Sequence, residues 1–139
     1  MRRIYHRFPQ SIDLDFELNR PFQEVLACLA RMHDTHTTAR GVDGLVKERI
    51  LVQITDGRTQ FLDMSELSLL GGDVTEMADF RIDLQKTLLT PEKKLPVSDN
   101  TFFLRIADKG AMTECYIAKE GGGDLDAIDL RNILKGACE

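Results

Sequence analysis

Two of the three histidines of the chain lie close together, in the stretch His33-Asp34-Thr35-His36, and Arg40 follows four residues later. An imidazole can ligate a metal, and an imidazole near a guanidinium can bind a phosphate or carboxylate. The familiar helical zinc signature has histidines four residues apart with a glutamate between them, and a zinc site needs further ligands. Here the spacing is three and that glutamate is missing. We therefore treat His33, His36 and Arg40 as a candidate ligand-binding site, and we expect no metal and no other cofactor.

The preceding segment offers a simpler interpretation of this stretch. Asn19 is suited to cap a helix and Pro21 to occupy its first turn. Apolar residues then follow at helical spacing: Phe22, Val25, Leu26, Leu29 and Met32. The pattern predicts a helix over about residues 20–33. Threonines and glycines come next, so the helix should end near His33, where an imidazole is stabilised by the helix dipole. This spacing favours a helix end over a ligand site and leaves both open.

Composition and charge limit the class of protein. The 139 residues fit one domain, 1–139, and 42% hydrophobic with 29% charged residues is typical of a globular chain. A net charge of −5 argues against general nucleic-acid binding, which depends on lysine and arginine neutralising phosphates. No segment approaches the ~18 consecutive apolar residues of a membrane span, and the first residues lack the apolar core of a signal peptide. We therefore expect no membrane partner.

The three cysteines, Cys28, Cys115 and Cys138, bear on the compartment. They are odd in number and have no C-x-x-C spacing, which predicts free thiols, a reducing compartment and a cytoplasmic location.

Alternation of apolar and polar residues predicts a strand over residues 12–18 and a hairpin over about 46–62. Asp56-Gly57 has the composition of a two-residue turn between the two arms of this hairpin. The expected cross-strand pairs are Thr55 with Arg58 and Val52 with Phe61.

A second hairpin is expected over residues 101–117, with the three-residue turn 108–110 and Gly110 in the left-handed conformation. The expected pairs are Phe102 with Tyr116 and Phe103 with Cys115. Apolar residues on both faces predict a central place in the sheet, which makes Cys115 an inert core thiol.

The remaining segments give weaker patterns. Residues 63–66 resemble a capping box that starts a short helix through residue 70. Residues 75–89 fit a strand and a helix almost equally, and the alternation of Arg81, Asp83 and Gln85 with apolar residues favours a strand. Two prolines and three charged residues predict a surface loop over 90–100. The glycines 121–123 read as a connector into a last helix, from about Asp124 to residue 137.

The R-x-x-x-R spacing of Arg3 and Arg7 resembles the arginine motif of PilZ domains. Asp63-Met64-Ser65 matches the start of that family's D/N-x-S-x-x-G turn. The resemblance implies cyclic-dinucleotide binding as a third possibility for function. Ser68 stands where the family has glycine, so the chain is not assigned to it.

Together these patterns predict an α+β protein: a mainly antiparallel sheet of two hairpins and an N-terminal strand, with two main helices packed on it. The function expected first is a small cytosolic, non-enzymatic binding or regulatory protein, whose partner is another protein or a second copy in a homodimer. The alternative is a small enzyme or ligand-binding protein with its site near His33, His36 and Arg40.

Overall fold

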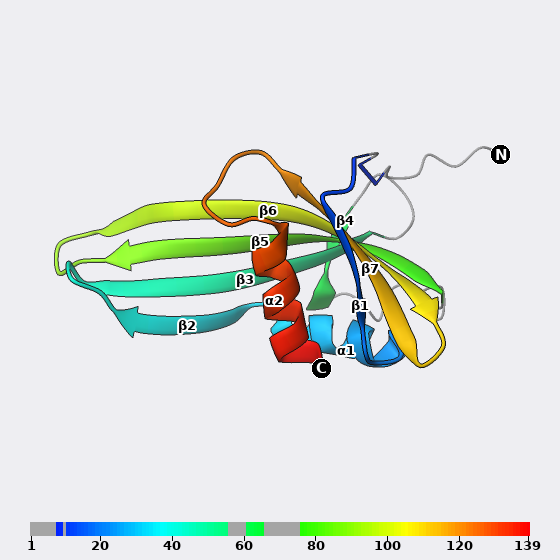
Figure 1. The fold of residues 1–139 in the computed structure, drawn as a ribbon. Helices are drawn as coiled ribbons and strands as arrows, with labels where there is room; N and C mark the ends of the chain where they lie inside the picture. The colour runs from blue at the N-terminus through cyan, green and yellow to red at the C-terminus, as the bar shows by residue number, and fades with distance from the viewer. Residues whose placement is uncertain (1–7, 10, 56–60, 66–75) are drawn as a thin grey trace.

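The computed structural model describes residues 8–9, 11–55, 61–65 and 76–139, and the statements below concern these residues. They form an antiparallel sheet of seven strands with two helices, which confirms the α+β class (Figure 1). The elements are β1 (Leu14–Leu18), α1 (Phe22–Met32), β2 (Thr35–Arg40), β3 (Leu45–Thr55), β4 (Phe61–Asp63), β5 (Met77–Leu89), β6 (Lys94–Lys109), β7 (Met112–Glu120) and α2 (Ala127–Cys138). The strand order is β1-β7-β6-β5-β3-β2, and β4 also pairs with β3.

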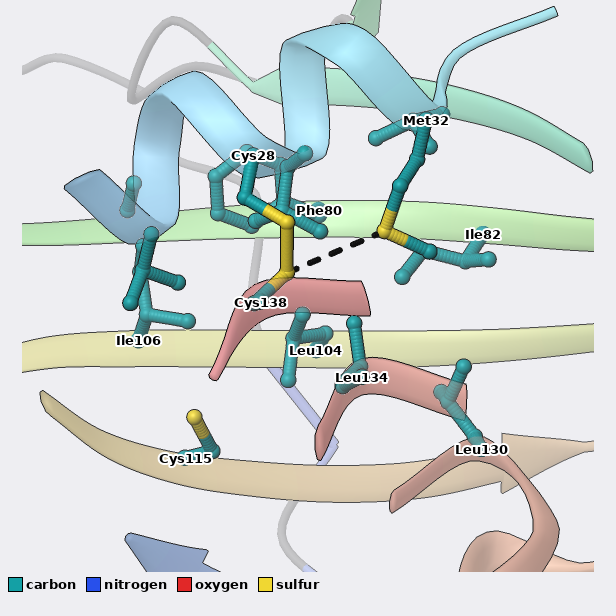
Figure 2. Packing of buried hydrophobic residues seen from close by; sticks show 14 of the residues in the cluster. Cys28, Met32, Phe80, Ile82, Leu104, Ile106, Cys115, Leu130, Leu134 and Cys138 are labelled. Atoms are coloured by element: carbon teal, nitrogen blue, oxygen red, sulfur yellow. Dashed lines mark hydrogen bonds between the residues drawn. A yellow bond between two sulfur atoms is a disulfide. The ribbon is translucent and has the colours of Figure 1, made fainter. Parts of the chain in front are cut away.

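The hydrophobic core lies where the two helices meet the sheet. Helix α1 contacts β3, β6 and β7, and α2 contacts β1, β7 and α1. Alternate residues of the central strands, such as Phe80, Ile82 and Leu104, are fully buried together with Leu130 and Leu134 of α2 (Figure 2). Neither helix is long and apolar enough to cross a membrane.

Helix α1 ends at His33, as its sequence predicts, but its start and its continuation differ from the expectation. The N-cap position is Pro21, whose carbonyl accepts from the N–H groups of Glu24 and Val25, and Asn19 is not the cap. Residues 35–40 form strand β2, which the sequence did not indicate. All six of its residues are exposed, so they carry no alternation between an apolar and a polar face.

The expected pairing of the 46–62 hairpin is wrong. Thr55 pairs with Phe61 rather than Arg58, and Val52 pairs with Ile82 of β5. Five residues separate the paired Thr55 and Phe61, so a two-residue turn at Asp56-Gly57 does not set this register. Residues 56–60 themselves lie outside the described part, as does the short helix expected after Ser65.

Strand β5 confirms the strand interpretation of residues 75–89, whereas the surface loop over 90–100 is wrong. Only residues 90–93 connect the strands, and β6 begins at Lys94 with Pro96 inside it. The register of β5 and β6 shifts between Lys86 and Thr87, next to the position that Pro96 occupies. Proline is tolerated at such bulges because it need not donate to the ladder there.

The β6–β7 hairpin is present, with a turn one residue shorter than expected. Lys109 pairs with Met112, so the turn residues are Gly110 and Ala111, and Gly110 has the predicted positive φ, +79°. Glycine at the first of two turn residues is typical of a type II′ turn. The expected pairs are wrong because the turn is shorter and begins two residues later than expected: Phe102 pairs with Lys119 and Phe103 with Ala118.

The cysteines also differ from the expectation of free thiols. Cys28 of α1 and Cys138 of α2 form a disulfide, and Met32 Sδ lies 3.9 Å from Cys138 Sγ (Figure 2). These cysteines are 110 residues apart in sequence, so their approach depends on how the two helices pack, which spacing alone does not reveal. Cys115 is the buried core thiol that the sequence predicts, and burial raises its pKa to about 12.

One part of the sheet reaches beyond the helices. Figure 1 shows β2 with the adjoining ends of β3, β5 and β6 extending to one side of α1 and α2. We call this part the overhang: residues 35–50 and 84–99. It carries exposed apolar side chains such as Val42, Leu45 and Val97. The overhang contributes to two surfaces, a cleft beside α2 and the outer edge of β2.

Candidate functional site

The structure places His33 at the end of α1, where it has a structural partner. Its Nδ1 accepts the backbone N–H of Val52 at 2.9 Å. Strand β2 begins at Thr35, opposite Ile50, so this N–H of β3 lies just beyond the strand and would otherwise lack a partner on that side. The imidazole therefore continues the hydrogen bonding of β3 past the end of β2.

His36 and Arg40 lie at opposite ends of β2, roughly 13 Å apart at ~3.3 Å per residue. His36 Nε2 lies 3.3 Å from Asp34 Oδ1, which also accepts from Arg49 Nε at 2.7 Å. The hydrogen bond from Arg49 lowers the pKa of Asp34. Arg40 instead lines a shallow hollow of about 520 Å³ between the β2–β3 and β5–β6 connections. The structure therefore does not gather the three candidate residues into one site: His33 is bound to Val52, His36 lies beside Asp34, and Arg40 lies at the far end of β2.

No group of three or more histidine, cysteine, aspartate or glutamate side chains within residues 8–9, 11–55, 61–65 and 76–139 is placed to hold a metal ion.

A more enclosed cleft of about 360 Å³ lies between α2 and the inner face of the overhang. Its apolar wall consists of Ile50, Leu84, Leu125 and Ile133. Its polar side chains are those of Glu48, Lys86, Ser98, Asn100, Asp129 and Asn132. Arg49 and Gln85 also line the cleft, but they alternate with these strand residues, so their side chains point to the other face of the sheet. The residues come from β3, β5, β6, α2 and the connector before α2, so no single stretch of sequence contains the site.

Asn100 fixes the end of the cleft at which α2 begins. It is only 1% exposed, its Nδ2 donates to Asp124 Oδ1 at 2.9 Å, and its Oδ1 accepts from the N–H of Leu125 at 3.1 Å. The hydrogen bond from Asn100 is the largest cause of the lowered pKa of Asp124. Both bonds tie the connector to β6 and thereby set where α2 starts.

The glycine before this connector is required by the same contact. Gly123 has φ +143°, and a Cβ on it would lie 2.0 Å from Asn100 Oδ1. Helix α2 then begins with a capping box: Asp126 Oδ1 accepts from the N–H of Asp129, and Asp129 Oδ2 accepts from the N–H of Asp126. The carboxylate of Asp129 lines the cleft but is engaged in holding the helix start.

The charged groups of the cleft that remain accessible are Lys86 and Glu48. They face each other across β5 and β3, with Nζ 3.8 Å from Oε1, and Glu48 is 57% exposed. A pair this long and exposed contributes little to stability, so its groups can exchange partners with a ligand. Asn132 of α2 adds an amide on the opposite wall.

The side chains that line the cleft offer several kinds of contact to a ligand. The described lining contains no histidine or cysteine, and its one serine, Ser98, forms a hydrogen bond to Asp124 that helps lower the pKa of that carboxyl group. Acyl transfer by a serine needs an adjacent base that takes its proton, and an ionised carboxylate with a lowered pKa is a poor one. What the lining offers is a cation, a carboxylate and an amide around an apolar wall.

Sequence reasoning missed this site. Asn100 and Ser98 stood in a segment interpreted as a loop, and Lys86 in one that fitted two kinds of element. The glycines 121–123 were the one available signal, since a conformation that only glycine adopts readily marks a close contact.

Comparison with known proteins adds no assignment: no protein-family model, curated protein or solved structure matches the chain. The class of protein is therefore defined by the fold and the cleft alone, an α+β protein with a candidate ligand site between its last helix and its sheet.

Proposed function

We propose that this chain is a non-enzymatic binding protein that holds a small amphipathic molecule in the cleft between α2 and the overhang. The observation that carries the proposal is the composition of this cleft. Its volume of about 360 Å³ lies in the range of ligand pockets, which are mostly apolar with a few placed polar groups. The apolar body of the ligand packs on Ile50, Leu84 and Ile133, and its polar group meets Lys86, Glu48 and Asn132.

The second candidate is the site expected from the sequence. Arg40 supports it, because this residue lines the hollow of about 520 Å³ with Leu45, Leu89 and Pro91. That hollow is more open than the cleft, and His33 is engaged by Val52. Cyclic-dinucleotide binding would rest on Arg3 and Arg7, which lie outside the described residues, and it is not proposed.

The cytoplasmic location and the homodimer stay predictions. Disulfides are rare in the reducing cytosol, so the bond between Cys28 and Cys138 favours an oxidising compartment. Light scattering decides the oligomeric state. A mass near 15.7 kDa that does not rise with concentration would exclude a stable dimer.

The ligand site can be tested with 8-anilinonaphthalene-1-sulfonate, an anionic aromatic probe that combines a charge with an apolar body. We expect saturable binding at one site, with NMR shifts of the backbone amides of Ile50, Leu84 and Asn132. Ile133→Trp should fill the cleft and weaken binding at least about tenfold, ~1.4 kcal/mol. The matched control is Ile128→Trp on the same helix, because Ile128 is exposed and does not line the cleft.

Equal affinity of Ile133→Trp and the unchanged protein would refute the proposal, provided that circular dichroism shows both folded. Shifts at residues 40–45 and 89–91 in place of the cleft would transfer the function to the second candidate.

A further inference from the structure

Strand β2 is the last strand of the sheet, and its outer edge is open in the part of the chain that the structure describes. It pairs with β3 on one side, and no described strand pairs with its other side. All of its residues, Thr35–Arg40, are exposed. Natural proteins blunt such edges with prolines, bulges or covering loops, because an open edge templates the addition of another strand. Strand β2 contains no proline and pairs with β3 without a register shift, and its one arginine, Arg40, is the only charge of this kind on it.

The hydrogen bonds at the β2–β3 connection show which backbone groups face this open edge. The N–H of Gly41 donates to the carbonyl of Gly44 at 2.7 Å, so Gly41 points towards β3. In an antiparallel pair this direction alternates along the strand. Thr35, Thr37 and Ala39 therefore bond to β3, and three residues present their N–H and C=O groups outward: His36, Thr38 and Arg40.

The side chains of these same three residues lie on one face, and that face is basic. In the register of the sheet, His36 lies beside Arg49 and Thr38 beside Lys47. Asp34 offsets part of this charge through its bond to Arg49. Arg40 and Lys47 make no ion pair with any described residue. The surface is thus locally cationic on a chain whose net charge is −5.

We propose that the edge of β2 binds an extended segment of an acidic partner protein by strand addition. The backbone of the segment pairs with His36, Thr38 and Arg40. Residues directly opposite each other in an antiparallel pair share a face. Aspartates or glutamates at every second position of the segment therefore lie on the same face as His36 and Arg40, and as Lys47 of β3, which is paired with Thr38. The alternating backbone donors and acceptors of β2 match a polypeptide strand, not a nucleic acid.

A second copy of this chain fits the edge less well. Two identical antiparallel strands in one sheet are related by a two-fold axis perpendicular to the sheet. The side chain of each residue therefore lies on the same face of the sheet as that of its partner residue in the second copy. Bonding through the outward groups then places Thr38 against Thr38 and Arg40 against His36 of the second copy. This ladder pairs a cation with an imidazole and contains no carboxylate, whereas an acidic segment complements the charge.

The test uses a fluorescent heptapeptide of alternating valine and aspartate, with a valine–lysine peptide as its control, read by fluorescence anisotropy. Thr38→Pro removes one outward N–H and leaves the bonds to β3 intact, and Thr38→Val keeps that N–H and a β-branched side chain. We expect the acidic peptide to bind the unchanged protein and Thr38→Val equally. Thr38→Pro and Arg40→Glu should each weaken binding at least about tenfold.

A peptide N-methylated on the residues that face β2 repeats the backbone test without changing the protein, should Thr38→Pro fail to fold. Undiminished binding of the N-methylated peptide, or equal binding of the valine–lysine peptide, would overturn the proposal. So would a dimer, seen by light scattering, that Thr38→Pro converts to monomers, because a second copy would then be the occupant of the edge.

Discussion

Reducing the bond between Cys28 and Cys138 should destabilise this protein strongly. The bond joins residues 110 positions apart and therefore closes a loop over most of the chain. It also links the helix nearest the N-terminus of the described fold to its last helix. Without it, α2 is held only by packing and by the contacts at its two ends.

The size of the effect follows from the loop. In the chain-entropy model, cross-linking a loop of this length destabilises the unfolded state by about 4–5 kcal/mol. Domains are typically stable by only about 5–15 kcal/mol, so the loss is a large fraction of the total. For a chain of this size we expect the melting temperature to fall by about 15 °C.

The assay compares urea and thermal unfolding of oxidised protein with protein that was reduced in urea and refolded in reductant. Reduction in urea is needed because both cysteines are buried, at 2% and 7% exposure. The double variant Cys28→Ala/Cys138→Ala should unfold alike with and without reductant. Cys115→Ala, which leaves the disulfide in place, should respond to reductant as the unchanged protein does.

Two results would refute this reasoning. Thiol titration of urea-unfolded, unreduced protein should give one free thiol, Cys115, and three would mean that the disulfide does not form. An unfolding free energy that reductant leaves unchanged would mean that the cross-link does not constrain the unfolded chain.

Three further predictions concern the start and the body of α2. Gly123→Ala should lower the unfolding free energy by about 1–3 kcal/mol, because alanine is strained at the positive φ and its Cβ would clash with Asn100. The control Gly122→Ala, whose added Cβ lies in open space, should change the unfolding free energy by less than ~0.5 kcal/mol. Gly136→Ala should raise the melting temperature, since Gly136 is inside the helix with nothing within 4 Å of an added Cβ, and alanine is favoured there by about 1 kcal/mol. The folded state lowers the pKa of Asp124 from its usual 3.8, so its carboxylate stabilises the fold above that pH and the contribution is lost as pH falls through the lowered value. In urea unfolding, the unchanged protein should have a higher unfolding free energy than Asp124→Asn, and this difference should shrink below pH 3.8. A difference in unfolding free energy that stays constant with pH would contradict the assigned hydrogen bond.

The sequence predicts those elements whose pattern is local. The apolar spacing of α1, the alternation in β3 and β7, and the glycine at position 110 each follow from one short segment. Strand β2 could not be predicted in this way, because both of its faces are exposed and its order comes from pairing with β3. The first part of β6, residues 94–100, was not predicted either, because Pro96 indicates a loop unless the bulge opposite it is known.

The candidate site was less accessible to prediction than the fold. The cleft gathers residues from five parts of the chain, and its key contact joins Asn100 to Asp124 across the β6–β7 hairpin. His33 was predicted as a candidate site residue from its type alone, but in the structure its imidazole completes the hydrogen bonding of β3. Residue types indicate which chemistry is available, but only the register of the sheet shows which groups are already engaged.

The overhang also has a consequence for the dynamics of the sheet. Its strands continue from a half covered by helices to a half with solvent on both faces, so one strand spans two environments. Local opening is easiest where few apolar contacts hold the backbone. Amide hydrogen exchange should therefore be graded along β3, β5 and β6, slow at Val52, Ile82 and Leu104 and progressively faster towards Leu45, Leu89 and Lys94. The ends of these strands would fray and reclose many times while the rest of the molecule stays folded.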